Sequence, residues 1–222
     1  MKKIIPLLIS VLLIMGLTAC GSAKSSDTAE KSVSAEANDA KAQNENEKTA
    51  ENAPAEAETE PSQADNDVLV IYFSATGTTR GVAEKIAAIT DADVYEIKAE
   101  QEYTTDDLNY NDPQSRTTLE QNDPSVRPKI GSEDISLDGY SVIYIGYPIW
   151  WGEEPRIMDT FVESQSFDGI TVIPFCTSSS SGIGRSGKNL ADNAGSGNWL
   201  NGQRFGAGAS QEELEAWING LQ

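Results

Sequence analysis

Residues 68–222 alternate between two hydrophobic patterns. Continuous apolar runs of five to eight residues are typical of strands buried on both faces of a sheet, whereas apolar residues three to four positions apart are typical of amphipathic helices. Strands are predicted from such runs at Val68–Phe73, Tyr140–Tyr147 and Ile170–Cys176. Asp93–Lys98 alternates like a strand nearer the edge of a sheet, and a short run at Gln203–Ala209 gives a fifth strand. Helices are predicted at 79–90, Pro155–Val162 (with the proline in its first turn), 184–193 and Gln211–Leu221 (with Ser210 as its N-cap).

This alternation predicts an α/β fold in which a five-stranded parallel sheet lies between two layers of helices. Right-handed crossovers leave few topologies for such a sheet, and we expect the strand order 2-1-3-4-5. Sheets of this kind bind ligands at the carboxyl ends of their strands, next to the point where the strand order reverses. The loops after strands one, three and four should therefore carry the function, and these are Ser74–Thr79, Pro148–Pro155 and Thr177–Gly187.

The segment 99–139 is long for a single connection between strands. Asp112 followed by Pro113 is typical of a helix cap and a first helical position, so we expect a short helix from there to about Gln121. The large apolar side chains of this segment are expected to cover one edge of the sheet, and they are Tyr103, Tyr110 and Leu119.

The first of the three loops is rich in hydroxyl groups, with four Ser or Thr residues around Gly77 in the run Ser74–Thr79. A phosphate at a helix N-terminus is held by free backbone N–H groups and by the positive end of the helix dipole. An ordinary capped turn needs only one or two hydroxyl residues. Because the loop has no lysine at the Walker A spacing, it predicts a phosphate monoester that is bound and kept rather than transferred.

The second loop carries two adjacent tryptophans, Trp150 and Trp151. Two such neighbours do not easily point into one core, so we expect one to pack on the following helix and the other to cover a flat aromatic ligand. The third loop is rich in serine and glycine and is expected at the polar edge of such a ring. Its match to G-x-G-x-x-G does not lie at the first strand–helix turn, and the next strand offers no acidic residue for a dinucleotide ribose. Its match to G-x-x-x-x-G-K has Asn189 where a Walker site needs Ser or Thr.

The N-terminal residues differ in composition from the rest. Residues 1–20 have a positive start, an apolar run and small residues before Cys20, which predicts an export signal, since the apolar run is short for a membrane-spanning helix. The sequence just before the cysteine resembles a bacterial lipobox, which implies acylation of Cys20 and a lipid anchor at the membrane. An ordinary signal peptide with an incidental Cys20 is the alternative. Residues 21–67 are acidic, polar and free of aromatic residues, so we expect a disordered tether.

Charge and missing residue types restrict the chemistry of the domain at 68–222. It has 23 acidic and 10 basic residues and thus a net charge of −13, which argues against nucleic acid and favours partners with basic patches. The chain has no histidine, which excludes Ser-His-Asp triads and histidine metal sites. Cys176 is the domain's only cysteine, so a Cys-rich metal site and an internal disulfide are excluded too, and we expect its thiol to be buried.

Together these loops resemble the flavodoxin family. The family's phosphate loop has the form S/T-x-T-G-x-T, and residues 146–152 (GYPIWWG) are similar to a bacterial subfamily of flavodoxins. The resemblance implies a flavodoxin-like fold with FMN as its cofactor. It implies that the phosphate is held by Ser74, Ala75, Thr76, Gly77, Thr78 and Thr79. It implies that the isoalloxazine ring is flanked by Pro148, Ile149, Trp150, Trp151 and Gly152, and on its other side by Thr177, Ser178, Ser179 and Gly182.

Three functions are open at this point. The first is a carrier that passes electrons between proteins, which the acidic domain favours. The second is an enzyme that uses FMN and a nicotinamide cofactor to reduce quinones or other small molecules. The third is a surface module that binds another phosphorylated ligand without redox chemistry.

Overall fold

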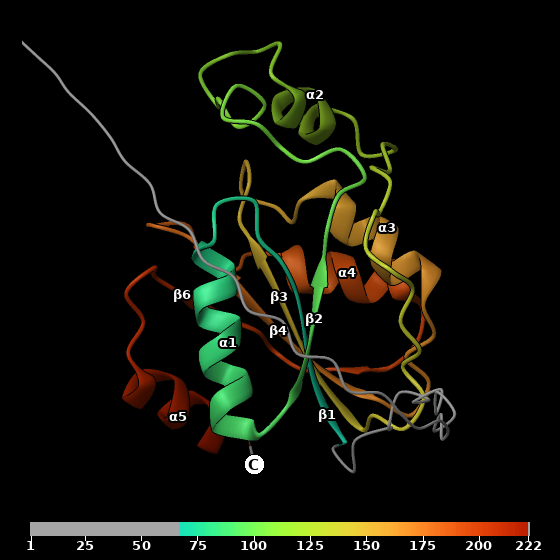
Figure 1. Cartoon of the computed structure of the whole chain (residues 1–222), viewed down its shortest axis with the longest axis vertical. Coiled ribbons are helices and arrows are strands. Elements are labelled where there is room, and N and C mark those ends of the chain that lie inside the picture. The colour runs from blue at the N-terminus through green and yellow to red at the C-terminus, as the bar shows by residue number, and fades with distance from the viewer. Residues whose placement is uncertain (1–66, 222) are drawn as a thin grey trace, which may run out of the picture. The chain divides into compact units, whose positions relative to one another are not determined.

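A parallel sheet forms the centre of the protein (Figure 1). The computed structural model describes residues 67–221, so the predictions for the signal, for Cys20 and for the tether up to residue 66 lie outside the described residues. The strands are β1 (Val68–Phe73), β2 (Asp93–Ile97), β3 (Val142–Pro148), β4 (Thr171–Thr177), β5 (Asn198–Trp199) and β6 (Gln203–Phe205). Their order is β2-β1-β3-β4-β5, with β6 also paired to β4, and every pairing between these strands is parallel. The predicted order 2-1-3-4-5 is confirmed.

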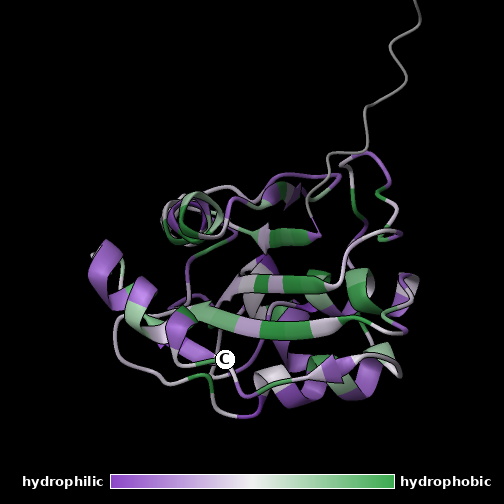
Figure 2. Ribbon diagram, turned by 90° about the horizontal axis from the view of Figure 1, so that it is seen from below, coloured by the Kyte–Doolittle hydropathy of each residue, from purple (hydrophilic) through white to green (hydrophobic). Residues whose placement is uncertain are grey.

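Helices cover both faces of the sheet. They are α1 (Thr78–Thr90), α2 (Arg116–Asn122), α3 (Arg156–Ser164), α4 (Ser186–Ala194) and α5 (Gln211–Asn219). Helices α1 and α5 lie on one face and α3 and α4 on the other, whereas α2 lies beyond the carboxyl end of β2 (Figure 1). Figure 2 shows the mainly hydrophobic strands between helices that carry polar residues on their outer sides.

Alternate residues of each strand fill two separate cores. In β1, Val70 and Tyr72 pack with α1 and α5, whereas Leu69, Ile71 and Phe73 pack with α3 and α4. This pattern follows from the period of two along a strand, which sends neighbouring side chains to opposite faces. Because both faces of the sheet are packed, the register of its strands is fixed. The register in turn fixes where each strand ends and the loop after it begins.

The fifth strand position differs from the prediction of a single strand at Gln203–Ala209. Strand β5 pairs with Thr171 and Val172 of β4, and β6 pairs with residues from Phe175 onward. The break between them coincides with Pro174 of β4, which has no backbone N–H for a ladder hydrogen bond. A proline inside a buried strand therefore splits its neighbour into two short strands.

The N-terminal caps of two helices also differ from the prediction. Ser115, not Asp112, is the N-cap of α2, because its hydroxyl accepts a hydrogen bond from the Thr118 N–H, while Asp112 begins a turn that closes on the Ser115 N–H. Pro155 is the N-cap of α3 and not part of its first turn. The predicted Ser210 cap of α5 is confirmed, since the serine accepts from the Glu213 N–H at 3.2 Å.

Among residues 67–221, no helix combines the length and the apolar composition that crossing a bilayer requires.

Candidate functional site

The loop between β1 and α1 presents the start of a long helix. Gly77 is the N-cap of α1 and has a φ of 85°, a left-handed conformation that glycine adopts far more easily than other residues. No side chain caps this helix end. The N–H groups of the first turn and the helix dipole together favour an anion at this place.

Ser74 is the residue of this loop that most directly indicates a ligand. Its hydroxyl oxygen is buried and has no hydrogen-bond partner within residues 67–221. A buried hydroxyl without a partner costs about 1–3 kcal/mol, and native proteins rarely keep one without a reason. A bound phosphate oxygen would satisfy it.

The threonines of the loop make two different hydroxyl contacts, one within the loop and one to the end of β4. The hydroxyls of Thr76 and Thr78 lie 3.3 Å apart at the surface, where both can reach a ligand. Thr79 is buried, and its hydroxyl forms a 2.8 Å hydrogen bond with the hydroxyl of Thr177 at the end of β4. Thr79 therefore ties the first loop to the third, and its hydroxyl already has a partner within the protein.

The loop after β3 closes in a tight turn. Trp150 and Glu153 exchange two backbone hydrogen bonds of 2.9 and 3.0 Å. The two residues between them, Trp151 and Gly152, have φ values of 51° and 87°. Positive φ at both central positions is the type I′ turn, which is unusual for tryptophan and costs about 1–3 kcal/mol in a residue with a side chain.

The two tryptophans point to different places. Trp150 packs edge-on against the rings of Phe73 and Tyr103, with centroids 5.6 and 5.2 Å apart, and packs against the core that also holds the buried residues of α3. Trp151 remains 44% exposed at the tip of the turn. Trp150 is thus held by its ring contacts, whereas Trp151 is exposed and can cover a ligand.

A pocket of about 410 Å³ joins the first loop to the second. Its walls come from three parts of the chain, and the lining residues are Thr76, Leu108, Tyr110, Thr117, Ile149, Trp150 and Trp151. Leu108, Tyr110 and Thr117 were not predicted as site residues, and they come from the segment between β2 and β3. Tyr110 is 74% exposed, so most of its side chain is open to solvent at this pocket. Its aromatic side chain within a long polar segment is the sequence feature that could have indicated a role in the site.

The third loop lies at the end of β4 but does not line this pocket. The Thr177 carbonyl accepts a hydrogen bond from the Ile149 N–H at 3.0 Å, and the Ser178 N–H donates to Phe205 at 3.1 Å. Ser179 and Gly182 are exposed. The loop therefore stands beside the second loop, and its contact with a ring remains a prediction.

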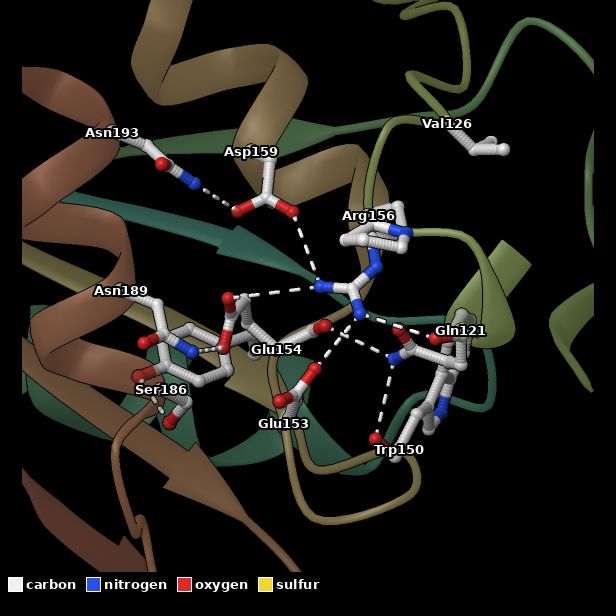
Figure 3. Close-up of polar contacts among 12 residues, drawn as sticks. Gln121, Val126, Trp150, Glu153, Glu154, Arg156, Asp159, Ser186, Asn189 and Asn193 are labelled. Atoms are coloured by element: carbon white, nitrogen blue, oxygen red, sulfur yellow. Dashed lines mark hydrogen bonds and ion pairs between the residues drawn. The ribbon is translucent and has the colours of Figure 1, made fainter.

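A buried arginine lies behind the Trp150–Glu153 turn (Figure 3). Arg156 is 6% exposed, and its guanidinium donates to the Glu153 carboxylate at 2.8 Å and to the Gln121 backbone carbonyl at 3.2 Å. It also lies 3.5 Å from the Asp159 carboxylate. These contacts hold the base of the turn against α2 and α3.

Glu154 is the most perturbed carboxyl of this cluster. It is 1% exposed and accepts a hydrogen bond from Asn189 at 3.2 Å. Burial raises its pKa from 4.5 to about 7, and the negative charges of Asp159 and Glu153 act in the same direction. The group next to the turn therefore changes charge near neutral pH. Cys176, by contrast, is buried as expected, and burial raises the pKa of its thiol to about 12.

Comparison with known proteins agrees with this arrangement. The profile of a flavodoxin family matches residues 67–221. A protein from Bacteroides uniformis assigned as a flavoprotein is 45% identical, with 69% of this chain and 98% of that chain covered and a TM-score of 0.66. A second such protein, from Bacteroides eggerthii, is 42% identical, with 70% and 97% covered and the same TM-score.

A flavoprotein from Lactobacillus acidophilus, solved in complex with FMN, is 21% identical and has a TM-score of 0.54, with 69% of this chain and 99% of that chain covered. At that identity the likeness supports the fold alone. No curated protein matches the chain significantly. Because the family profile covers the whole described sheet with its three loops, the chain belongs to the flavodoxin family.

Proposed function

We propose that this protein binds FMN and transfers electrons between other proteins. One observation carries the proposal, which is that a single pocket joins Thr76 of the hydroxyl-rich loop to Trp150 and Trp151. FMN combines a phosphate with a flat aromatic ring, and this pocket places a phosphate-binding loop beside an aromatic surface. Membership of the flavodoxin family supports the same cofactor, and the Lactobacillus acidophilus protein of the same fold was solved in complex with FMN.

The residues of the first loop fit the phosphate. Ser74 offers a buried hydroxyl without a protein partner, and the uncapped start of α1 offers backbone N–H groups. The loop has no lysine to activate a phosphate for transfer, which suits a group that is only held. Bound FMN would supply the redox chemistry, and the protein would bind and orient it.

The residues that line the pocket and the net charge of the domain favour electron transfer between proteins over catalysis. Its seven lining residues include no carboxyl, amine or imidazole that could move protons to and from a small substrate. The domain carries a net charge of −13, which suits docking of a basic protein partner. A reductase that uses a nicotinamide cofactor is the second candidate.

Anaerobic titration tests this proposal. The full chain is mixed with FMN and freed of excess, and its visible spectrum is followed during stepwise addition of dithionite. A yellow protein that accepts electrons in two separate one-electron steps is the expected result. A colourless protein would contradict FMN binding, and rapid oxidation of NADPH with a quinone acceptor would favour the reductase.

We propose further that Cys20 carries a lipid that holds the protein at the outer face of the cell membrane. The proposal rests on the small residues before Cys20 and on the apolar run that precedes them. In a bacterial host fed radioactive palmitate, the wild-type chain should be labelled and should enter the detergent phase, while Cys20→Ala should do neither. An unlabelled wild-type chain would contradict acylation.

A further inference from the structure

The segment between β2 and β3 contributes to the same pocket as the two predicted ligand loops. It contains α2 and lies beyond the carboxyl end of the sheet (Figure 1). Three of the seven residues that line the 410 Å³ pocket belong to it, namely Leu108, Tyr110 and Thr117. No family motif that we identified in the sequence includes them. They line the pocket together with Trp151 and Ile149, which come from the loop after β3.

Two large aromatic side chains are exposed at this pocket. Tyr110 is 74% exposed and Trp151 is 44% exposed. Exposed aromatic residues gathered at one pocket are typical of a binding site, because a flat ligand between them removes apolar surface from water. The pocket offers such a ligand a tyrosine from one segment and a tryptophan from another.

The Tyr110 segment is held in shape by its own hydrogen bonds. Asp107 organises it, because its carbonyl accepts from both the N–H and the hydroxyl of Thr117, at 3.1 and 2.6 Å. The Asp107 carboxylate accepts from the N–H and the hydroxyl of Thr104, at 2.9 and 2.8 Å. Tyr110 therefore lies in a loop that the hydrogen bonds between Asp107 and Thr117 close.

The same segment is joined to the loop after β3, which also lines the pocket. Gln121 at the end of α2 is buried, and its side-chain N–H₂ donates to the backbone carbonyls of Trp150 at 3.2 Å and Glu154 at 3.0 Å (Figure 3). Tyr103 contacts Trp150, and its hydroxyl donates to Glu120 of α2 at 2.8 Å. The two sides of the pocket are thus parts of one connected structure.

We propose that Tyr110 forms a wall of the flavin site and packs on the isoalloxazine ring across the pocket from Trp151. This inference rests on the proposed binding of FMN and adds to it a residue outside the three loops. Since the contact is with the ring, it should act on FMN and on riboflavin alike. Loss of one aromatic contact should weaken binding roughly 3- to 10-fold.

The test measures dissociation constants of the full chain for FMN and for riboflavin by flavin fluorescence. Tyr110→Ala should raise both constants roughly 3- to 10-fold, and Tyr110→Phe should stay within about 2-fold of wild type because the ring is kept. Leu119→Ala is the matched control, since Leu119 lies on α2, is 50% exposed and does not line the pocket. It should bind both flavins as the wild type does.

The outcomes separate this inference from the proposed function. If the wild type binds FMN and Tyr110→Ala binds both flavins equally well, the inference is wrong and the proposed function stands. A loss for FMN without a loss for riboflavin would also overturn it, since that pattern belongs to the phosphate. If the wild type binds neither flavin, the proposed function fails and this inference fails with it.

Discussion

Glu154 determines part of how the stability of this protein depends on pH. Its pKa is about 7 in the folded state because the carboxyl is buried, against 4.5 when it is exposed in the unfolded chain. Between these values the folded protein holds a proton that the unfolded chain has released. The free energy of unfolding is therefore highest, as far as Glu154 contributes, below pH 4.5 and falls as the pH rises through about 7.

The size of this effect follows from the two pKa values. They differ by about 2.5, and each unit is worth about 1.36 kcal/mol, so the whole window corresponds to roughly 3.4 kcal/mol. Between pH 5 and pH 8 the same two values give about 2.5 kcal/mol. Asp159 has a raised pKa as well, again mainly through burial, so the wild-type protein loses more than the part due to Glu154.

Glu154→Gln isolates the contribution of this carboxyl. The glutamine stays neutral at every pH, and any change in packing is the same at pH 5 and pH 8. Urea unfolding of wild type and variant at both values should show that the variant gains about 2.5 kcal/mol relative to wild type as the pH rises. Asp192→Asn is the control, because Asp192 is an exposed carboxyl on α4, and it should keep the wild-type profile.

A stability difference between Glu154→Gln and wild type that stays constant from pH 5 to pH 8 would refute this reasoning. It would mean that the carboxyl is ionised in the folded protein throughout, with Arg156 at 3.9 Å and Asn189 compensating the loss of water.

Three further predictions concern the loops and the sheet. At Trp151, where φ is 51°, glycine should give a more stable ligand-free protein than alanine by about 1 kcal/mol, the reverse of the usual order, and equal urea midpoints for the two variants would contradict a left-handed turn. Ser74→Ala should stabilise the ligand-free protein by up to about 1 kcal/mol, since it removes a hydroxyl without a partner, yet weaken binding of FMN more than that of riboflavin in fluorescence titrations. Gly146→Ala should lower the free energy of unfolding by about 1–3 kcal/mol, because its Cβ would lie 2.1 Å from the buried Phe175 ring, and an unchanged thermal midpoint would show that the ring moves freely.

The strands were predictable because each carries its signal in a few adjacent residues. Val68–Phe73 is confirmed to the residue, and the order of the sheet follows from general rules for parallel crossovers. The fifth strand was misplaced because its break reflects Pro174 on a neighbouring strand, which a reading of local pattern does not take into account.

The site was predictable only where it follows a strand directly. The ends of β1 and β3 locate the hydroxyl-rich loop and the tryptophan turn, since parallel strands end at one edge of the sheet. The position of Tyr110 at the pocket depends on turns and hydrogen bonds around Asp107. Such contacts leave no periodic hydrophobic pattern in the sequence. The buried charges around Arg156 are likewise set by tertiary contacts between α2, α3 and α4.

The split between β5 and β6 also shortens the outer edge of the sheet. An outer strand with a long row of free backbone N–H and C=O groups is a template on which another copy of the chain can add a strand. Here that side of the sheet presents only two and three residues in succession. Pro174, on the adjoining strand, thus coincides with an interruption that leaves another chain little continuous edge on which to pair.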